Sequence, residues 1–311
     1  GRLFVSASIG VNLSAPELYK QLPHAIRMLS DTDGDGTFDK ATTFADNMTF
    51  PQGALWHEGA LYVASPPSIW KLEDINGDGK ADKRTEIATG FASTGNGAGV
   101  HGPFLGPTGR IYWCHGRKGH EVYQQDGTLV SKAKAARVWS ALPDGSDIRV
   151  FAGGGMDNPV ELAFTPEGDL LGSVDLFYQG PRRDVLVHWI HGGVYPRRDQ
   201  VPVLAEFKQT GEILPHMVDL GHVAPSGLTR YRGTHFGPEF QNNLFLCEFN
   251  THRVTRVVLE QKGSTYQGRT EVFLSSPDSG VHFTDVLEDA DGSLLVINTG
   301  GWFLRGCPTS A

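Results

Sequence analysis

Two short acidic stretches carry the clearest chemical signal in this sequence of 311 residues. Their alternate positions are the candidate ligands of a hard cation: Asp31, Asp33, Asp35, Thr37 and Asp39 in the first stretch, and Asp74, Asn76, Asp78, Lys80 and Asp82 in the second. Oxygens at every second position can wrap a cation, and Gly36 and Gly79 permit the sharp turn that this requires. Ca²⁺ suits such a cage of protein oxygens better than Mg²⁺ does.

These stretches differ from EF-hands. The twelfth position, where an EF-hand has a bidentate Glu, is Thr42 in the first stretch and Thr85 in the second. Both stretches lie between predicted strands rather than helices. We therefore expect calcium loops that pin hairpins structurally, with regulation by Ca²⁺ and a metal-free acidic turn as the two alternatives.

A second set of polar residues recurs at the start of a repeated strand. Glu161 and Asp285 stand at one aligned position, and histidines or an amide come just before it, namely His101, Asn158, His222 and His282. A His is the natural general base near neutral pH, so we take His101 as the candidate base, with Glu161 or Asp285 orienting it or accepting a substrate hydroxyl. Two alternatives remain: the histidines share a transition metal, or each polar residue only bonds nearby backbone or water.

The elements that must position these residues are repeated hairpins. Turn-centred segments align on their glycines and start at residues 51, 101, 160, 225 and 284. Repeats of this size with several short strands are typical of a β-propeller. We predict an all-β fold with six blades of four antiparallel strands, in which the first blade lacks its innermost strand and the last blade its outer ones. The only helix that we expect covers residues 15–21.

Composition limits the function classes. The net charge is −8 and no basic stripe is present, which argues against nucleic-acid binding. No apolar run approaches the length of a membrane span. The three cysteines, Cys114, Cys247 and Cys307, form no CxxC or CxxCH motif, so no cysteine-pair zinc site or attached c-type haem is encoded. We expect residues 1–311 to be a single propeller domain excised from a longer chain.

Several motifs resemble a known family. They are the two acidic loops within SDTDGDGTFDKATTFADNMTFPQG and SIWKLEDINGDGKADKRTEIATGF, then VAPSGLTRYRG, FTDVLEDADGSLLVINTGGWF and the final GCP. Together they resemble the propeller domain of bacterial proteins named as membrane-bound dehydrogenases, which often carry a haem-binding cytochrome c domain. The chain is more distantly similar to the soluble PQQ-dependent sugar dehydrogenases, which are six-bladed propellers.

The resemblance implies a mechanism and an extracytoplasmic, bacterial location, in the periplasm or at the cell surface. In the sugar dehydrogenases a His placed like His101 removes the hydroxyl proton, and hydride passes to PQQ. Their Arg-Asn-Pro motif corresponds to Asp157-Asn158-Pro159, so the Arg that would hold the quinone is absent, and Arg253 is the remaining cationic candidate.

Two functions follow as hypotheses. The first is a dehydrogenase-like propeller that oxidises a sugar or other alcohol with His101 as base, holding Ca²⁺ structurally and PQQ as the candidate cofactor. The second is a non-catalytic propeller that binds carbohydrate or protein and scaffolds attached electron-transfer domains. The expected partners are a small-molecule or carbohydrate ligand and a cytochrome c domain elsewhere in the full chain.

Overall fold

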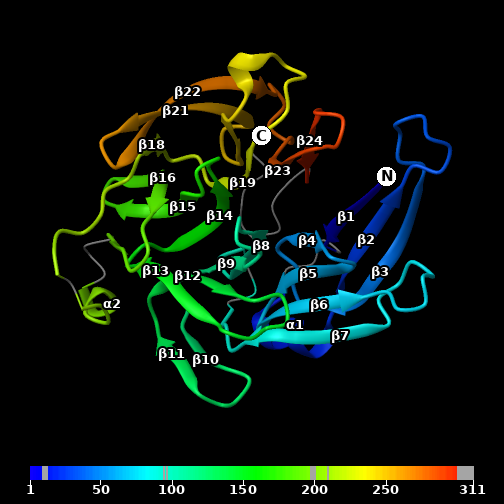
Figure 1. Ribbon diagram of the computed structural model, residues 1–311, viewed down its shortest axis with the longest axis horizontal. Coiled ribbons are helices and arrows are strands. Elements are labelled where there is room, and N and C mark those ends of the chain that lie inside the picture. The colour runs from blue at the N-terminus through cyan, green and yellow to red at the C-terminus, as the bar shows by residue number, and fades with distance from the viewer. Residues whose placement is uncertain (9–12, 94, 96, 197–200, 209, 300–311) are drawn as a thin grey trace. The chain divides into compact units, whose positions relative to one another are not determined.

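The computed structural model describes residues 1–8, 13–93, 95, 97–196, 201–208 and 210–299. Within these residues the chain forms two compact units. Unit 1 comprises residues 1–134 and 139–150, and unit 2 comprises residues 135–138 and 151–299. The regular structure of both units is mainly antiparallel strands (Figure 1), and no helix of the described part is long and apolar enough to cross a membrane.

Unit 1 begins with two sheets whose strands follow the chain order. The first contains β1 (Arg2–Ala7), β2 (His24–Ser30) and β3 (Lys40–Met48), with helix α1 (Ala15–Gln21) between β1 and β2. The second contains β4 (Ala54–His57), β5 (Ala60–Ser65), β6 (Ser68–Glu73) and β7 (Lys83–Thr89). The first sheet thus has three strands, and the helix has the predicted bounds.

The middle of the chain is less regular. A sheet with the order β17-β13-β12-β9-β8 is formed by β8 (Val100–Leu105), β9 (Ile111–His115), β12 (Ala136–Ala141), β13 (Arg149–Gly154) and β17 (Val194–Tyr195). Strands β12 and β13 have residues in both units. A separate ribbon of β10 (His120–Tyr123) and β11 (Leu129–Ala133) interrupts this sheet in sequence, and β17 joins β13 in parallel. Neither the ribbon nor β17 was expected from the sequence.

Unit 2 contains the last three sheets. The first is β14 (Asn158–Phe164), β15 (Leu170–Gln179), β16 (Arg182–Trp189) and β18 (Val218–Gly221). The second is β19 (Pro225–Arg230), β20 (Leu244–Glu248), β21 (Arg253–Lys262) and β22 (Thr265–Ser275), and the third is β23 (Phe283–Glu288) with β24 (Leu294–Asn298). Helix α2 (Val201–Leu204) and a 3₁₀ turn (Pro238–Phe240) add helical residues beyond those predicted.

The aligned glycines explain why the hairpins repeat. Gly59, Gly109, Gly168 and Gly292 each occupy the turn between the first two strands of a sheet, with φ between +77° and +96°. A residue with a Cβ rarely adopts such a conformation, so these turns need glycine. In β5, β9 and β20 every residue is buried, and each of these strands is apolar except for its last residue, which is Ser65, His115 or Glu248.

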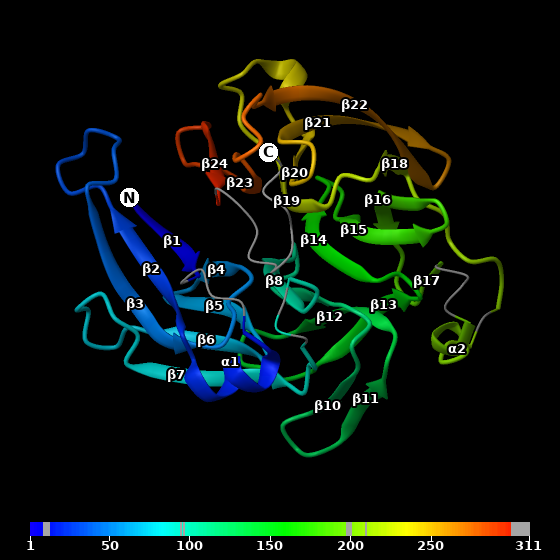
Figure 2. The ribbon, with the colours of Figure 1, turned by 180° about the vertical axis from the view of Figure 1, so that it is seen from behind.

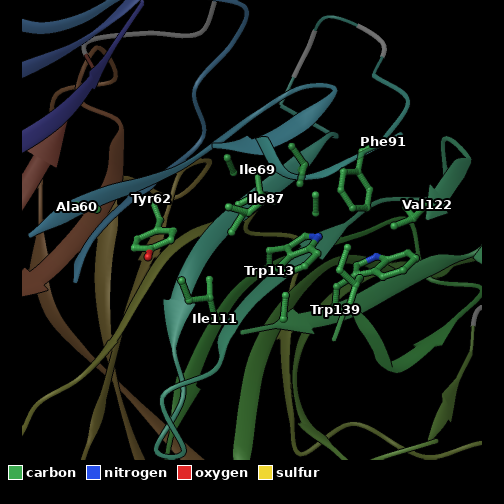
Figure 3. Packing of buried hydrophobic residues seen from close by; sticks show 14 residues of the cluster. Ala60, Tyr62, Ile69, Ile87, Phe91, Ile111, Trp113, Val122 and Trp139 are labelled. Atoms are coloured by element: carbon green, nitrogen blue, oxygen red, sulfur yellow. The ribbon is translucent and has the colours of Figure 1, made fainter. Parts of the chain in front are cut away.

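Aromatic side chains fill the core of unit 1. Trp113 of β9 and Trp139 of β12 stack with parallel rings whose centroids are 6.4 Å apart, and Phe91 meets both edge-on. Figure 3 shows these three rings grouped together with Val122 beside them. Each of the four residues is at most 1% exposed, so this cluster fixes the strands that lead to His101 and His115.

Candidate functional site

The inner strands of unit 2 bring two predicted catalytic residues together. Strands β14, β19 and β23 lie side by side, with β19 in the middle (Figures 1 and 2). The hydroxyl of Ser226 in β19 donates to the carbonyl of Phe283 in β23 at 3.1 Å. A Cβ on Gly227 would lie 2.4 Å from the Cα of Asp285, so glycine is what allows the backbones of β19 and β23 to approach.

Glu161 and Asp285 interact electrostatically across these strands. Burial and, secondarily, the negative charge of Asp285 raise the pKa of Glu161 well above its usual value, against the N–H of Leu228, which lowers it. Burial raises the pKa of Asp285 to about 6, against the N–H of Val286, which donates to its Oδ1 at 2.8 Å. Both residues keep some accessible surface. The two carboxyls thus form an electrostatically linked pair in which burial favours the protonated form of each.

Cys247 of β20 lies against the same carboxyls. Burial raises the pKa of its thiol, and the charges of Asp285 and Glu161 raise it further. The thiol therefore stays protonated and is a packing group rather than a nucleophile. Cys114 is likewise buried, and neither cysteine is in a disulfide. Cys307 lies outside the described residues.

The predicted cofactor residues of unit 2 differ in exposure. Asn158, the first residue of β14, is buried and pairs in register with Asp175 of β15. His222 is exposed in the loop before β19. Arg253, at the start of β21, is exposed and pairs in register with Glu248. Exposure leaves His222 and Arg253 accessible to a ligand.

His282 belongs to an aromatic cluster that the sequence did not reveal. Its ring stacks on Phe249 with a centroid distance of 4.1 Å, and the ring of His252 lies 4.8 Å away. The Nδ1 atom of His282 is 3.0 Å from the carbonyl of Phe249, and that of His252 is 2.6 Å from the carbonyl of Val281. A carbonyl only accepts, so both Nδ1 atoms carry the proton and a neutral ring has its lone pair on Nε2.

His101 lies in unit 1, on β8, where it pairs with Cys114 of β9. It is 6% exposed. The next residue, Gly102, donates its N–H to the carbonyl of Gln52 at 3.2 Å, and the Gln52 amide donates to the carbonyl of Gly97. These bonds tie the glycine-rich segment before β8 to the entrance of β4. The convergence of His101 with Glu161 and Asp285 remains a prediction.

His115, the last residue of β9, supports the glycine-rich segment before β8 from the protein interior. It is fully buried, and its Nε2 donates to the carbonyl of Ala92 at 2.9 Å. Burial lowers the pKa of His115 to about 4, which keeps the ring neutral at physiological pH. Its Nδ1 is buried without a hydrogen bond in the structure. His115 therefore acts as a structural support of the segment that leads to His101.

The first acidic loop, residues 31–39, joins β2 and β3 and is folded around its own carboxylates. Asp31 accepts the N–H groups of Gly34 and Gly36, and Asp39 accepts both the N–H and the hydroxyl of Thr32. The pKa of Asp31 is lowered mainly by those two backbone donors. Oxygens of Asp31, Asp33 and Asp35 lie within 4.8 Å of one another. This donor set fits a hard cation.

The second acidic loop, residues 74–82, joins β6 and β7 and repeats the same bonds. Asp74 accepts the N–H groups of Gly77 and Gly79, and Asp82 accepts those of Ile75 and Asn76. Unlike the first loop it packs against the neighbouring sheet. The N–H of Ala81 donates to the carbonyl of Phe44 at 2.8 Å, and a Cβ on Gly79 would lie 3.1 Å from the methyl carbon of Met28.

One cleft in unit 2 contains none of the predicted site residues. It has a volume of about 540 Å³ and lies between β18 and β22, with Met217, Asp219, Lys262, Tyr266 and Gln267 among its lining residues. Its walls come from the outermost strands of two sheets rather than from the inner strands.

Comparison with solved structures identifies the fold as the β-propeller type. A protein described as an oxidoreductase (glucose dehydrogenase) from Thermus thermophilus is 19% identical, with a TM-score of 0.60 over 88% of this chain and 84% of that one. The holo form of the pyranose dehydrogenase PQQ domain from Coprinopsis cinerea is 14% identical, with a TM-score of 0.59 over 88% and 85%. A gluconolactonase from Xanthomonas campestris is 15% identical, with a TM-score of 0.52 over 90% and 77%.

These likenesses establish the fold and leave the chemistry open, since the neighbours include both oxidoreductases and a lactonase. No curated protein matches the sequence. One family model, described as "Domain of unknown function (DUF7133)", matches residues 1–299, which is nearly the whole chain. The chain therefore belongs to the DUF7133 family.

Proposed function

We propose that this chain is the propeller of an extracytoplasmic dehydrogenase that oxidises a sugar or another alcohol. The observation that carries the proposal is the pair of Glu161 and Asp285, two carboxyls with raised pKa values on the inner strands that flank β19. Carboxyl groups tuned in this way occur most often at functional sites. The dehydrogenases among proteins of the same fold support the choice of reaction.

His101 is the proposed base that removes the proton of the substrate hydroxyl. Glu161 and Asp285 bind the other hydroxyls, since a carboxyl accepts hydrogen bonds when ionised and can also donate one when protonated. When bound, a quinone such as PQQ would supply the hydride acceptor. Asn158, His222, Arg253 and His282 are the residues that would hold it, and two of these side chains are accessible cation or imidazole donors.

Two further parts of the proposal concern cations and partners. The two acidic loops hold structural Ca²⁺, because each loop presents carboxylates already oriented by its own N–H groups. A cytochrome c domain elsewhere in the full chain would accept the electrons. For this function we expect the described sheets to be blades of one six-bladed propeller domain.

The test is reconstitution with Ca²⁺ and PQQ, followed by dye reduction across a panel of sugars and alcohols. His101→Ala should lower the rate by at least about a hundredfold, the usual effect of losing a general base. His57→Ala is the matched control, because His57 also lies in unit 1, where its ring is near the side chains of Glu58 and Tyr62. No turnover with any substrate would exclude the dehydrogenase.

A non-catalytic carbohydrate-binding propeller is the second candidate. The observation in its favour is Asp157, which places a negative charge where the sugar dehydrogenases have the quinone-binding Arg. A quinone with several carboxylates would be repelled there. Binding on a glycan array by the unmodified chain, without turnover in the reconstitution assay, is the result that would select this function.

A further inference from the structure

Asp184 is a buried carboxylate that ties two distant segments of unit 2 together. It is the third residue of β16 and is 0% exposed. Its Oδ1 accepts the N–H of Leu176, in β15, at 2.9 Å. Its Oδ2 accepts the N–H groups of Val223 and Ala224, just before β19, at 2.8 and 2.9 Å. Three backbone donors on one buried carboxylate form a strong, charge-assisted set of hydrogen bonds.

Two of these three donors lie in a backbone conformation that residues with a side chain rarely adopt. Leu176 has a φ of +56° and Ala224 a φ of +50°. Such positions are strained and persist only where the surroundings impose them. In both residues the N–H points at Asp184. The carboxylate therefore helps to hold these two conformations.

The loop held by Asp184 is also held from its other side. The N–H of Asn250 donates to the carbonyl of Val223 at 2.9 Å, and the N–H of Phe249 donates to that of Ala224 at 3.1 Å. Residues 223 and 224 thus lie between β16 and the turn that follows β20. His222, the proposed ligand residue, is the residue immediately before this clamped pair.

A second carboxyl, Asp175, lies beside Asp184, because the N–H that Oδ1 of Asp184 accepts belongs to Leu176, the residue next to Asp175. The side chains of the two carboxyls are close enough to interact. Burial and the charge of Asp184 raise the pKa of Asp175 to about 7, and the guanidinium of Arg182, 2.9 Å away, opposes this. The backbone of Asp157 also reaches this region, since its N–H donates to the carbonyl of Leu176, and His222 directly precedes the clamped pair in the chain.

We propose that Asp184 is the positioning residue for the loop that carries His222, and that protonation of the adjacent Asp175 sets how firmly this loop is held. Loss of that proton places two negative charges side by side in a buried site, which weakens the clamp. The assignment of His222 to a ligand site rests on the proposed function, whereas the clamp itself does not.

Amide hydrogen exchange of Val223 and Ala224 tests the proposal without any ligand. When the loop opens, Asp175 regains its ordinary pKa near 3.8, so the closed form binds more protons between about pH 4 and about pH 7. After correction for the intrinsic exchange rate, protection should fall at least about tenfold between about pH 5 and about pH 7 and stay level above. The amide of Val187, within β16, should not follow this profile.

Two variants separate the role of Asp175, which sets the pH dependence, from that of Asp184, which holds the loop. Asp175→Asn keeps a donor to Asp184 at every pH, so protection of the two amides should no longer vary across that range. Asp184→Asn puts an NH₂ group among three donors and should abolish protection at all pH values. Asp219→Asn is the matched control, because Asp219 is a nearby aspartate that accepts the N–H of Gly221 and lies 3.5 Å from Arg183.

A flat wild-type profile, or an unchanged slope in Asp175→Asn, would overturn the proposal. If Asp184→Asn does not fold, the wild-type and Asp175→Asn profiles still decide it. Absence of dehydrogenase activity has no bearing on the exchange result, so failure of the proposed function is distinguishable from failure of the clamp.

Discussion

Asp285 of β23 lies near enough to Glu161 of β14 for its negative charge to raise the pKa of the Glu161 carboxyl. The strand between them, β19, makes this proximity possible, because Gly227 leaves no side chain against Asp285. The two acids therefore titrate as neighbours, although 124 positions separate Glu161 from Asp285 in the chain.

The first prediction concerns the stability of unit 2 against pH. The pKa of Asp285 is raised from 3.8 to about 6, so its contribution to stability is present below about pH 4 and is lost as the pH rises through about 6. Asp285→Asn should remove this loss, which is at most about 3 kcal/mol. Denaturant unfolding at about pH 4 and about pH 8 measures it. An equal pH dependence in variant and wild type would contradict the prediction.

The second prediction concerns His115. Burial lowers its pKa from 6.5 to about 4, so its stabilising effect is complete above about pH 6.5 and is lost as the pH falls through about 4. The loss for the wild type is about 3 kcal/mol. His115→Gln retains an amide donor for the Ala92 carbonyl but does not titrate. The variant should therefore lose less stability than the wild type as the pH falls. Unfolding followed by tryptophan fluorescence is suitable, because Trp113 and Trp139 lie in the same unit.

The third prediction concerns Ca²⁺. Chelation should lower the thermal midpoint, since a ligand bound only by the folded chain stabilises it. Asp74→Asn should reduce the Ca²⁺-dependent shift more than Asp31→Asn does, because the second loop packs against β3 through Ala81. Asp126→Asn is the control, being a turn aspartate in unit 1 that accepts one N–H and has no alternating acidic partners. A thermal midpoint that does not change when chelator is added would rule out the calcium assignment.

The fourth prediction concerns Asp157. Asp157→Arg should strengthen PQQ binding by about tenfold or more, because an Arg–carboxylate hydrogen bond is worth about 1.5–3 kcal/mol. Asp157→Asn separates the two effects, since it removes the negative charge without adding a cation. Quenching of protein fluorescence by added PQQ gives the affinities. Equal affinities for all three chains would show that this position does not contact the quinone.

The repeated hairpins could be predicted from the sequence because their turns need a specific residue. The four aligned glycines all have positive φ, and the strands after them start with apolar residues, as in β5 and β9. The ribbon of β10 and β11 was missed because its strands are short and partly exposed, so they show no clear alternation. Strand β17 has two residues, too few for any pattern.

The candidate site was predictable only where the repeat itself positions a residue. Glu161 and Asp285 share a register in the repeat, and the structure places them within electrostatic reach. Asp184 was missed because a charged residue at the start of a strand looks solvent-facing. Its partners Val223 and Ala224 are 39 and 40 positions away, in a loop whose path no local pattern encodes.

The two buried cysteines can report separately on the opening of each unit. Cys114 lies in unit 1 and Cys247 in unit 2, and both are 0% exposed. A thiol reagent can reach either sulfur only after the surrounding strands separate. The labelling rates of these two sites, read by mass spectrometry of the separate peptides, would therefore reveal whether the two units open together or one after the other.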